Sequence, residues 1–210
     1  MERALARTGD ASLMARIEAS LAYVATDKSD LASALERCER ALAFADLPAQ
    51  VRGVLLCQMA VILRRNGNAS RALESFDQAI HELRAQPGEL AKAYLNRGTV
   101  HLDRGDPDAA GRDFAESARQ YGLAGEEESR AKADHNLGYA LFRAGDLVGA
   151  LRAMGTAQQV LGPMSPVNNA VCEQDTAEVL LAAGLVSEGT DRLRGAARDY
   201  GSRRLRQRQA

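Results

Sequence analysis

The sequence predicts an all-α protein, a right-handed α-solenoid of five helix–turn–helix repeats. Two observations predict this fold: a segment pattern that recurs five times, and a composition that suits closely packed helices. Hydrophobic residues make up 46% of the 210 residues, but aromatic residues only 4%, and tryptophan is absent. A core built from Ala, Leu and Val fits helix–helix packing better than a β-sandwich, which favours β-branched and aromatic residues.

The repeat is clearest from residues 136–157, which read NLGYALFRAGDLVGALRAMGTA. They align without gaps with residues 20–41, 58–79, 96–117 and 175–196. Four positions keep their character in every copy: a small residue (Ala22, Ala60, Gly98, Gly138, Ala177), a second small one (Ala34, Ala72, Ala110, Ala150, Gly189), a bulky or apolar one (Cys38, Phe76, Phe114, Met154, Leu193) and a small one again (Ala41, Ala79, Ser117, Ala157, Ala196). The copies lie 38, 38, 40 and 39 residues apart, and the variation falls in the link between copies.

The positions that recur in the copies have a physical reason within a pair of antiparallel helices. Gly138 and Ala150 are expected to face each other, since two helix backbones approach closely only where the side chains are small. That packing offsets the cost of about 1 kcal/mol that a glycine imposes inside a helix.

Turn chemistry separates the two helices of each copy. Left-handed glycines end the first helix, and N-cap residues begin the second. The expected glycines are Gly67, Gly105, Gly145 and Gly184, and the expected caps are Asp30, Asn68, Asp106 and Asp146. Pro107 falls at the first helical position, where proline costs little. The first copy has Ser29 in place of glycine, so a different turn is expected there.

These repeats resemble the tetratricopeptide repeat (TPR) family, whose signature includes L-G-x₂-Y and then A-x₃-F on a helix–turn–helix unit. The resemblance covers about residues 13–200. The spacing exceeds the common 34 residues, and the family's proline near the repeat end is mostly missing, so the chain looks like the longer variants. It also looks like the TPR region of bacterial, especially actinobacterial, proteins that carry a CHAT peptidase domain, or of large bacterial regulators.

The domain organisation follows from the copies. Residues 1–12 are expected to be an N-terminal lead-in, and the five repeats to span about 13–47, 48–86, 87–124, 125–164 and 165–200. Residues 201–210, GSRRLRQRQA, are interpreted as the start of a further helix that is cut short.

The resemblance implies a binding groove lined by the first helices. Asn96 and Asn136 occupy the position at which peptide-binding TPRs of the longer kind use asparagine, whose amide both donates to and accepts from a peptide backbone. Lys92 and Lys132 lie one turn earlier and would favour acidic groups. The other candidates on these helices are Thr99, His135, Tyr139 and Arg143. A solvated polar face without a ligand is the plainer alternative.

Catalysis, metal binding and cofactors are not predicted. The sequence holds no G-x-S-x-G, P-loop, Rossmann or HExxH motif. Cys38, Cys57 and Cys172 lie far apart and form no CxxC pair, which is typical of a reducing, cytoplasmic setting. A Cys172–His135 pair one repeat apart is conceivable, but a lone cysteine on an alanine-rich helix is usually a core residue. No signal peptide or membrane span is evident.

The predicted function is therefore a non-catalytic scaffold that binds a peptide or protein segment in the first-helix groove. One alternative is a regulatory or sensing module of a larger protein, such as a CHAT-type peptidase, with a C-terminal domain of the same protein as partner. A less favoured alternative is an RNA-binding helical repeat, against which the net charge of −1 counts.

Overall fold

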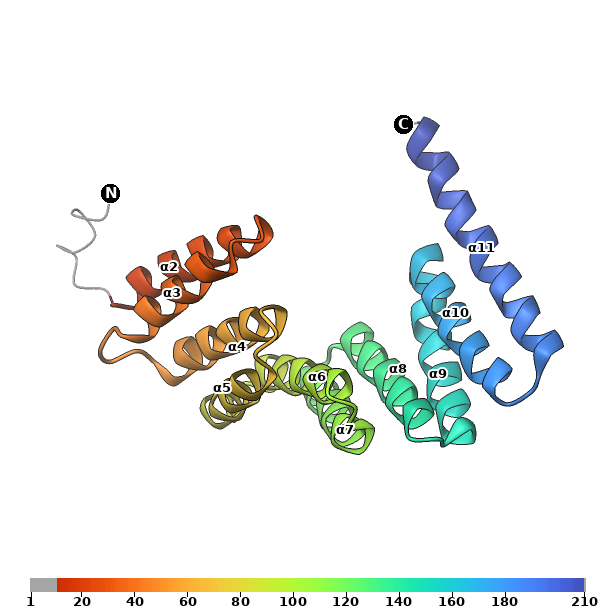
Figure 1. Cartoon of the computed structure of the whole chain (residues 1–210), viewed down its shortest axis with the longest axis horizontal. Helices are drawn as coiled ribbons and strands as arrows, with labels where there is room; N and C mark the ends of the chain where they lie inside the picture. The colour runs from red at the N-terminus through yellow and green to blue at the C-terminus, as the bar shows by residue number, and fades with distance from the viewer. Residues whose placement is uncertain (1–10, 210) are drawn as a thin grey trace. The chain divides into compact units, whose positions relative to one another are not determined.

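Helices account for most of the residues that the structure describes. The computed structural model describes residues 11–209, so most of the expected lead-in lies outside the described residues. Ten α-helices and a short 3₁₀ turn at Gly162–Met164, with no strand, make up the described part (Figure 1). The helices are α2 (Ala11–Asp27), α3 (Leu31–Leu42), α4 (Ala49–Arg65), α5 (Ala69–Glu82), α6 (Pro87–Asp103), α7 (Pro107–Ala124), α8 (Glu127–Arg143), α9 (Leu147–Leu161), α10 (Pro166–Ala182) and α11 (Val186–Gln209). This confirms the all-α prediction.

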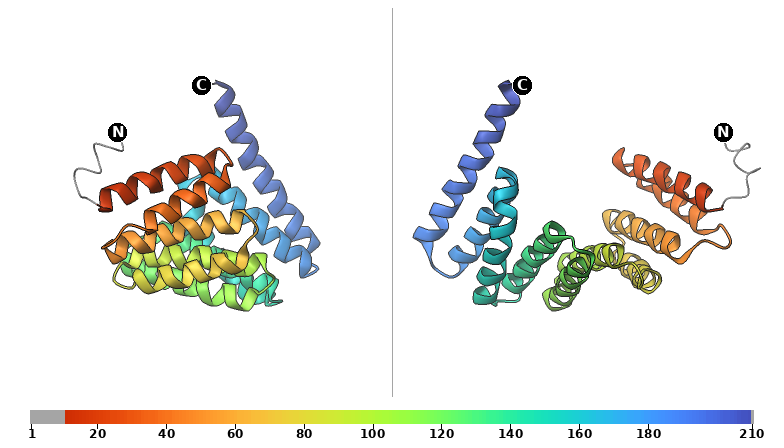
Figure 2. Two further views of the ribbon diagram at one scale, coloured as in Figure 1. Left: turned by 60° about the vertical axis from the view of Figure 1, so that its left-hand side comes forward. Right: turned by 180° about the vertical axis from the view of Figure 1, so that it is seen from behind.

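The chain divides into two compact units, Met1–Val100 and His101–Ala210, whose boundary falls within α6. In the first unit α2 packs on α3, α3 on α4, and α4 on α5. In the second unit α8 packs on α7 and α9, and α10 packs on α9 and α11. The successive helices joined by short turns run antiparallel, as Figure 2 shows for α8 with α9 and α10 with α11. Each unit is therefore a stack of helical hairpins.

The hairpin turns form as the glycine and cap positions predict. Gly67, Gly105, Gly145 and Gly184 have φ values of 76°, 76°, 91° and 79°. The side chains of Asp30, Asn68, Asp106 and Asp146 accept hydrogen bonds from the backbone three residues later. A left-handed residue followed directly by a cap residue thus reverses the chain within three residues.

The first turn was expected to differ because it has Ser29 in place of glycine, but it has the same conformation as the other turns. Ser29 adopts φ 62°, in the left-handed region that glycine occupies elsewhere. Asp30 N donates to Ala25 O at 2.9 Å, as Asn68 N donates to Leu63 O at 2.9 Å in the second turn. The hydrogen bonds and the Asp30 cap therefore hold a non-glycine residue in a conformation that costs about 1–2 kcal/mol.

The close approach of α8 and α9 explains the glycine inside α8. A β-carbon built on Gly138 would lie 2.7 Å from Met154 Cγ and 3.2 Å from both Ala150 O and Met154 N. Two of these three atoms belong to the backbone of α9, so the neighbour has little room to yield. Gly138 is a packing residue, whereas Gly145 ends the helix.

Burial follows the repeat positions, with one exception. The first small residue, the second small residue and the last small residue are buried in every copy. Cys38, Phe76, Phe114 and Met154 are at most 1% exposed, but Leu193, at the same position of the fifth copy, is 40% exposed. No described helix covers the side of α11 that Leu193 occupies.

The C-terminal segment corrects an expectation. Residues 201–209 do not begin a further helix, because α11 continues without a break from Val186 to Gln209. The segment after Gly184 contains no proline, and arginine, glutamine and leucine are good helix formers. Single glycines at 195 and 201 do not interrupt such a helix.

Replacing Gly138 with leucine is expected to destabilise the fold by about 1–3 kcal/mol, because the new side chain overlaps the backbone of α9. Urea denaturation measures the change. The matched control is Gly155→Leu on α9, where a β-carbon meets nothing within 4 Å. Equal midpoints for the two variants would contradict the packing role of Gly138.

Replacing Ser29 with glycine is expected to stabilise the protein by about 0.5–1 kcal/mol, since glycine adopts a positive φ without steric cost. Ser29→Ala is the control, because it removes the hydroxyl but keeps the β-carbon. Thermal unfolding compares the two. A Ser29→Gly variant no more stable than Ser29→Ala would show that Ser29 is not strained.

Candidate functional site

The predicted binding residues form two sets, one in each unit. Lys92, Asn96 and Thr99 lie on α6 in the first unit. The second set lies on α8 in the second unit and consists of Lys132, His135, Asn136, Tyr139 and Arg143. Within each set the spacing of three, four and seven residues places the side chains along one side of a helix.

On α6 the expected ligand-binding groups are bonded to their own helix. Lys92 Nζ lies 2.8 Å from Glu89 Oε1. Asn96 Nδ2 donates to Lys92 O at 2.9 Å, and Thr99 Oγ1 donates to Leu95 O at 3.0 Å. The amide oxygen and one N–H of Asn96 remain available to another partner, whereas the hydroxyl hydrogen of Thr99 is already donated to Leu95 O.

On α8 two polar groups are left without a partner. The Asn136 amide is half-buried and the Arg143 guanidinium is exposed, and neither forms a hydrogen bond or ion pair with any residue the structure describes. Lys132 Nζ instead pairs with Glu128 Oε1 at 2.6 Å. Tyr139 packs edge-on against Phe142, with ring centroids 6.0 Å apart. The second unit therefore offers a free amide beside a fixed aromatic ring and a free cation.

His135 differs from its expected place in an open groove. The residue is 6% exposed, and its Nε2 lies 2.8 Å from Oδ2 of Asp175 on α10. Two buried atoms have no hydrogen-bond partner: His135 Nδ1, and the hydroxyl Oγ1 of Thr176, which follows Asp175 on α10. His135 thus joins two neighbouring first helices and is not presented to a ligand.

Asp175 and Cys172 shift the titration of His135. Burial disfavours the imidazolium, but the hydrogen bonds and charges of Asp175 and Cys172 outweigh it and raise the pKa of His135 to about 9. A Cys–His–Asp set has the composition of an activated nucleophile. However, Cys172 is only 1% exposed, so a substrate has no route to its sulfur. The set is built into the core between the helices.

The other thiols are equally unreactive. Burial raises the pKa of both Cys38 and Cys57 to about 12, so both stay protonated at neutral pH. Among the described residues, no group of three or more His, Cys, Asp or Glu side chains is arranged to hold a metal ion.

Hydrogen bonds join neighbouring first helices at equivalent repeat positions in both units. Gln58 Nε2 on α4 donates to Ala19 O on α2 at 2.7 Å. Gln58 and Asp175 occupy the asparagine position of their copies, and Ala19 and His135 both precede that position in the copy before. A longer or acidic residue at this position therefore bonds to the preceding first helix, whereas Asn136 does not.

A concavity between α2 and α4 was missed by the sequence reasoning. It encloses about 140 Å³ and is lined by Tyr23, Thr26, Asp27, Gln58, Val61, Ile62 and Arg65. Tyr23 is 70% exposed and occupies the same repeat position as Tyr139. That shared position is the signal that finds Tyr23 in the sequence.

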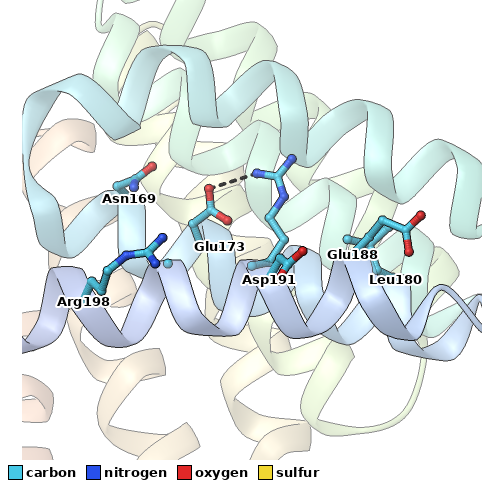
Figure 3. Close-up of a pocket in the computed structure, with 8 residues that line it drawn as sticks. Asn169, Glu173, Leu180, Glu188, Asp191 and Arg198 are labelled. Carbon is cyan, nitrogen blue, oxygen red and sulfur yellow. Dashed lines mark hydrogen bonds and ion pairs between the residues drawn. The ribbon is translucent and has the colours of Figure 1, made fainter.

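A larger groove, of about 630 Å³, lies along α10 and α11 (Figure 3). The Glu173 carboxylate at its centre pairs with Arg192 at 2.9 Å and accepts from Gln158 Nε2 at 2.6 Å. The first copy repeats this pair, with Arg37 Nη1 lying 3.1 Å from Glu18 Oε2 at the equivalent positions. The recurring pair ties two helices together, and its charges neutralise each other, which indicates a structural role.

None of the described helices combines the length and apolar character needed to cross a membrane.

The stability of the second unit is expected to depend on the protonation of His135. Because the pKa rises from an ordinary 6.5 to about 9 on folding, its contribution is complete below pH 6.5 and is lost as the pH rises through 9. The contribution is on the order of 1–3 kcal/mol.

Urea denaturation across this pH range tests the dependence against His135→Gln, with His81→Gln as a control for an exposed histidine. His81→Gln is expected to follow the wild-type profile. Parallel pH profiles for the wild type and His135→Gln would contradict the assignment.

Comparison with known proteins gives partial relatives and a shared fold. No family model matches the chain. The chain is 32% identical to the Photosystem I assembly protein Ycf3 of Prochlorococcus marinus over 106 residues. This alignment covers 50% of this chain and 53% of that protein. The Ycf3 of Parasynechococcus marenigrum is 34% identical over 100 positions, covering 46% and 57%. The chain thus spans about half the length of the curated relatives it matches.

Solved structures match over more of the chain. BtubC (BKLC) from P. vanneervenii superposes with a TM-score of 0.85 at 16% identity, covering 96% of this chain and 86% of that chain. A putative kinesin light chain of Podosopora anserina, with nearly identical TPR-like repeats, gives 0.77 at 15% identity, covering 92% and 98%. The Rap conjugation gene regulator of plasmid pLS20, in complex with the Phr* peptide, gives 0.66 at 18% identity, covering 88% and 53%. The chain has the TPR-like helical repeat fold.

Proposed function

We propose that this chain is a non-catalytic interaction scaffold that holds an extended peptide segment along its first helices, chiefly through the peptide backbone. The observation that carries the proposal is the free amide of Asn136, which lies on α8 between Lys132 and Arg143 and has no partner among the described residues. The Asn136 amide is not among the buried groups that lack a partner, so its donor and acceptor are open to solvent and available to a ligand.

Backbone recognition fits the chemistry of this face. An amide oxygen and an amide N–H match the N–H and C=O of one residue of an extended chain, whatever its side chain. Tyr139, held by its contact with Phe142, adds a rigid apolar surface beside the amide. In the first unit, Tyr23 offers a comparable exposed ring next to the concavity between α2 and α4.

Selection of acidic ligands has less support than backbone recognition. Lys92 and Lys132 are paired with Glu89 and Glu128 on their own helices. Exposed pairs of this kind are weak and can be exchanged for a ligand, but they lower the positive potential of the face. Arg143 is the first-helix cation in the second unit that keeps its charge unpaired.

The comparisons support an interaction role at a coarse level. TPR-like repeat proteins generally mediate protein–protein interaction. The Rap regulator of similar fold is solved with a peptide bound, and the partial relatives are named assembly proteins. Three free cysteines are consistent with a reducing compartment such as the cytoplasm.

The regulatory-module alternative drew on a resemblance to the TPR regions of larger bacterial proteins and on residues 201–210 as the start of a further helix. The second ground does not hold, because residues 201–209 extend α11. RNA binding has little support, because the net charge is −1 and Lys92 and Lys132 are paired with Glu89 and Glu128 on their own helices.

Peptide binding is tested by selecting a ligand from a random peptide display library and titrating it calorimetrically. Asn136→Ala is expected to weaken binding about 10-fold, since two hydrogen bonds to the peptide backbone are lost, worth about 1–2 kcal/mol together. Asn96→Ala is expected to have a smaller effect because that amide already bonds to Lys92 O.

The matched control is Gln159→Ala, which removes an exposed amide from α9. Its affinity should equal that of the wild type. Undiminished affinity in Asn136→Ala would exclude the first-helix face as the binding surface.

A further inference from the structure

The outer side of α11 carries an apolar row that nothing in the described structure covers. Val186, Leu193 and Tyr200 follow one another at intervals of seven residues and are 62%, 40% and 41% exposed. α11 packs mainly against α10, with one hydrogen bond from Arg192 to Gln158 of α9, and forms the edge of the second unit (Figure 2). We call these three residues the tail face.

The tail face is a copy of a buried surface in the same unit. Its residues lie 39 positions after Leu147, Met154 and Leu161 of α9. Met154 and Leu161 are 0% and 4% exposed, because Val179 and Cys172 of α10 pack against them. A first helix placed beside α11, as α10 is placed beside α9, would bury the tail face in the same way.

The opposite face exists on α2. Ile17, Leu21 and Val24 lie 38 positions before Leu55, Met59 and Ile62 of α4. Leu55 and Ile62 are 2% and 1% exposed, buried against Ala41 and Cys38 of α3. We call Ile17, Leu21 and Val24 the head face. Leu21 and Val24 are 38% and 47% exposed, since no described helix precedes α2.

We propose that the tail face of one copy of this chain docks on the head face of a second copy, in the register that joins α9 to α10. In that register Leu193 meets Val24, as Met154 meets Val179, and Tyr200 meets Ile17, as Leu161 meets Cys172. Each face supplies what the other requires, so a second copy satisfies both at once.

The charges at this contact are already compensated. Glu18 lies beside the head face and is bound by Arg37 at 3.1 Å and Arg40 at 3.2 Å. The repeat alignment places Ala197 opposite it, where the second unit has Gln158 opposite Glu173. The contact therefore buries apolar side chains without stranding a charge.

A head-to-tail contact joins two different surfaces, so it leaves one face of each type open and propagates along a chain of copies. We expect short oligomers whose length grows with protein concentration. The probe is the 210-residue chain itself, examined by sedimentation velocity over a wide concentration range.

Two variants block one face each: Leu193→Arg the tail face, and Val24→Arg the head face. Both side chains are substantially exposed, so the fold should survive, which circular dichroism verifies. Each variant alone is expected to stay monomeric. Val148→Arg on α9 is the matched control, because Val148 is 69% exposed and lies outside both faces; it should assemble like the wild type.

Mixing the two blocked variants distinguishes this contact from any other. Val24→Arg keeps an intact tail face and Leu193→Arg an intact head face, so an equimolar mixture is expected to form a 1:1 dimer that grows no further. A wild type that is monomeric at every concentration, a mixture that stays monomeric, or a Leu193→Arg variant that still assembles would each overturn the proposal.

Discussion

The close contact between the two helices of a hairpin is the constraint on which the rest of the structure depends. Where small residues face each other, as Gly138 faces Ala150, the helices leave no room for a side chain: a β-carbon on Gly138 would lie 3.2 Å from both Ala150 O and Met154 N. Neighbouring first helices meet at a matching register, since Gln58 bonds to Ala19 and Asp175 to His135 at equivalent repeat positions. Asn136 occupies the same repeat position but forms no such contact, so its amide stays free.

The first helices therefore carry both packing residues and proposed binding residues, and the two kinds differ in burial and in side-chain size. Small residues lie at the closest approach to the hairpin partner, as the fully buried Ala22, Ala60 and Ala177 show. Asn136 and Arg143 of α8 are more accessible, and neither has a partner among the described residues. A scaffold of this kind changes its ligand by substitution on one side without disturbing the other. The buried His135–Asp175 pair is the exception, because these polar side chains join two first helices and do not face solvent.

Local features were predictable from the sequence, and features that depend on register were not. Glycine turns and N-caps involve residues within three positions of one another, so spacing alone identified Gly145 and Asp146. The burial of His135 depends on a residue 40 positions away, and nothing in the spacing showed that Asp175 would reach it. The pairing of Lys92 with Glu89 and of Lys132 with Glu128 follows from helical spacing of three and four residues, so it was predictable from the sequence. Ser29 shows a further limit, since tertiary context overrides the preference for glycine at a positive φ.

The claim that the first helices form the binding surface is tested most directly by nuclear magnetic resonance of the chain with a selected peptide. The account predicts that the side-chain amide signals of Asn136 shift on titration, together with the backbone signals of Tyr139 and Arg143 on α8. Signals from the groove of Glu173 and Arg192 along α10 and α11 should stay in place. Shifts confined to that groove, with Asn136 unchanged, would contradict the account.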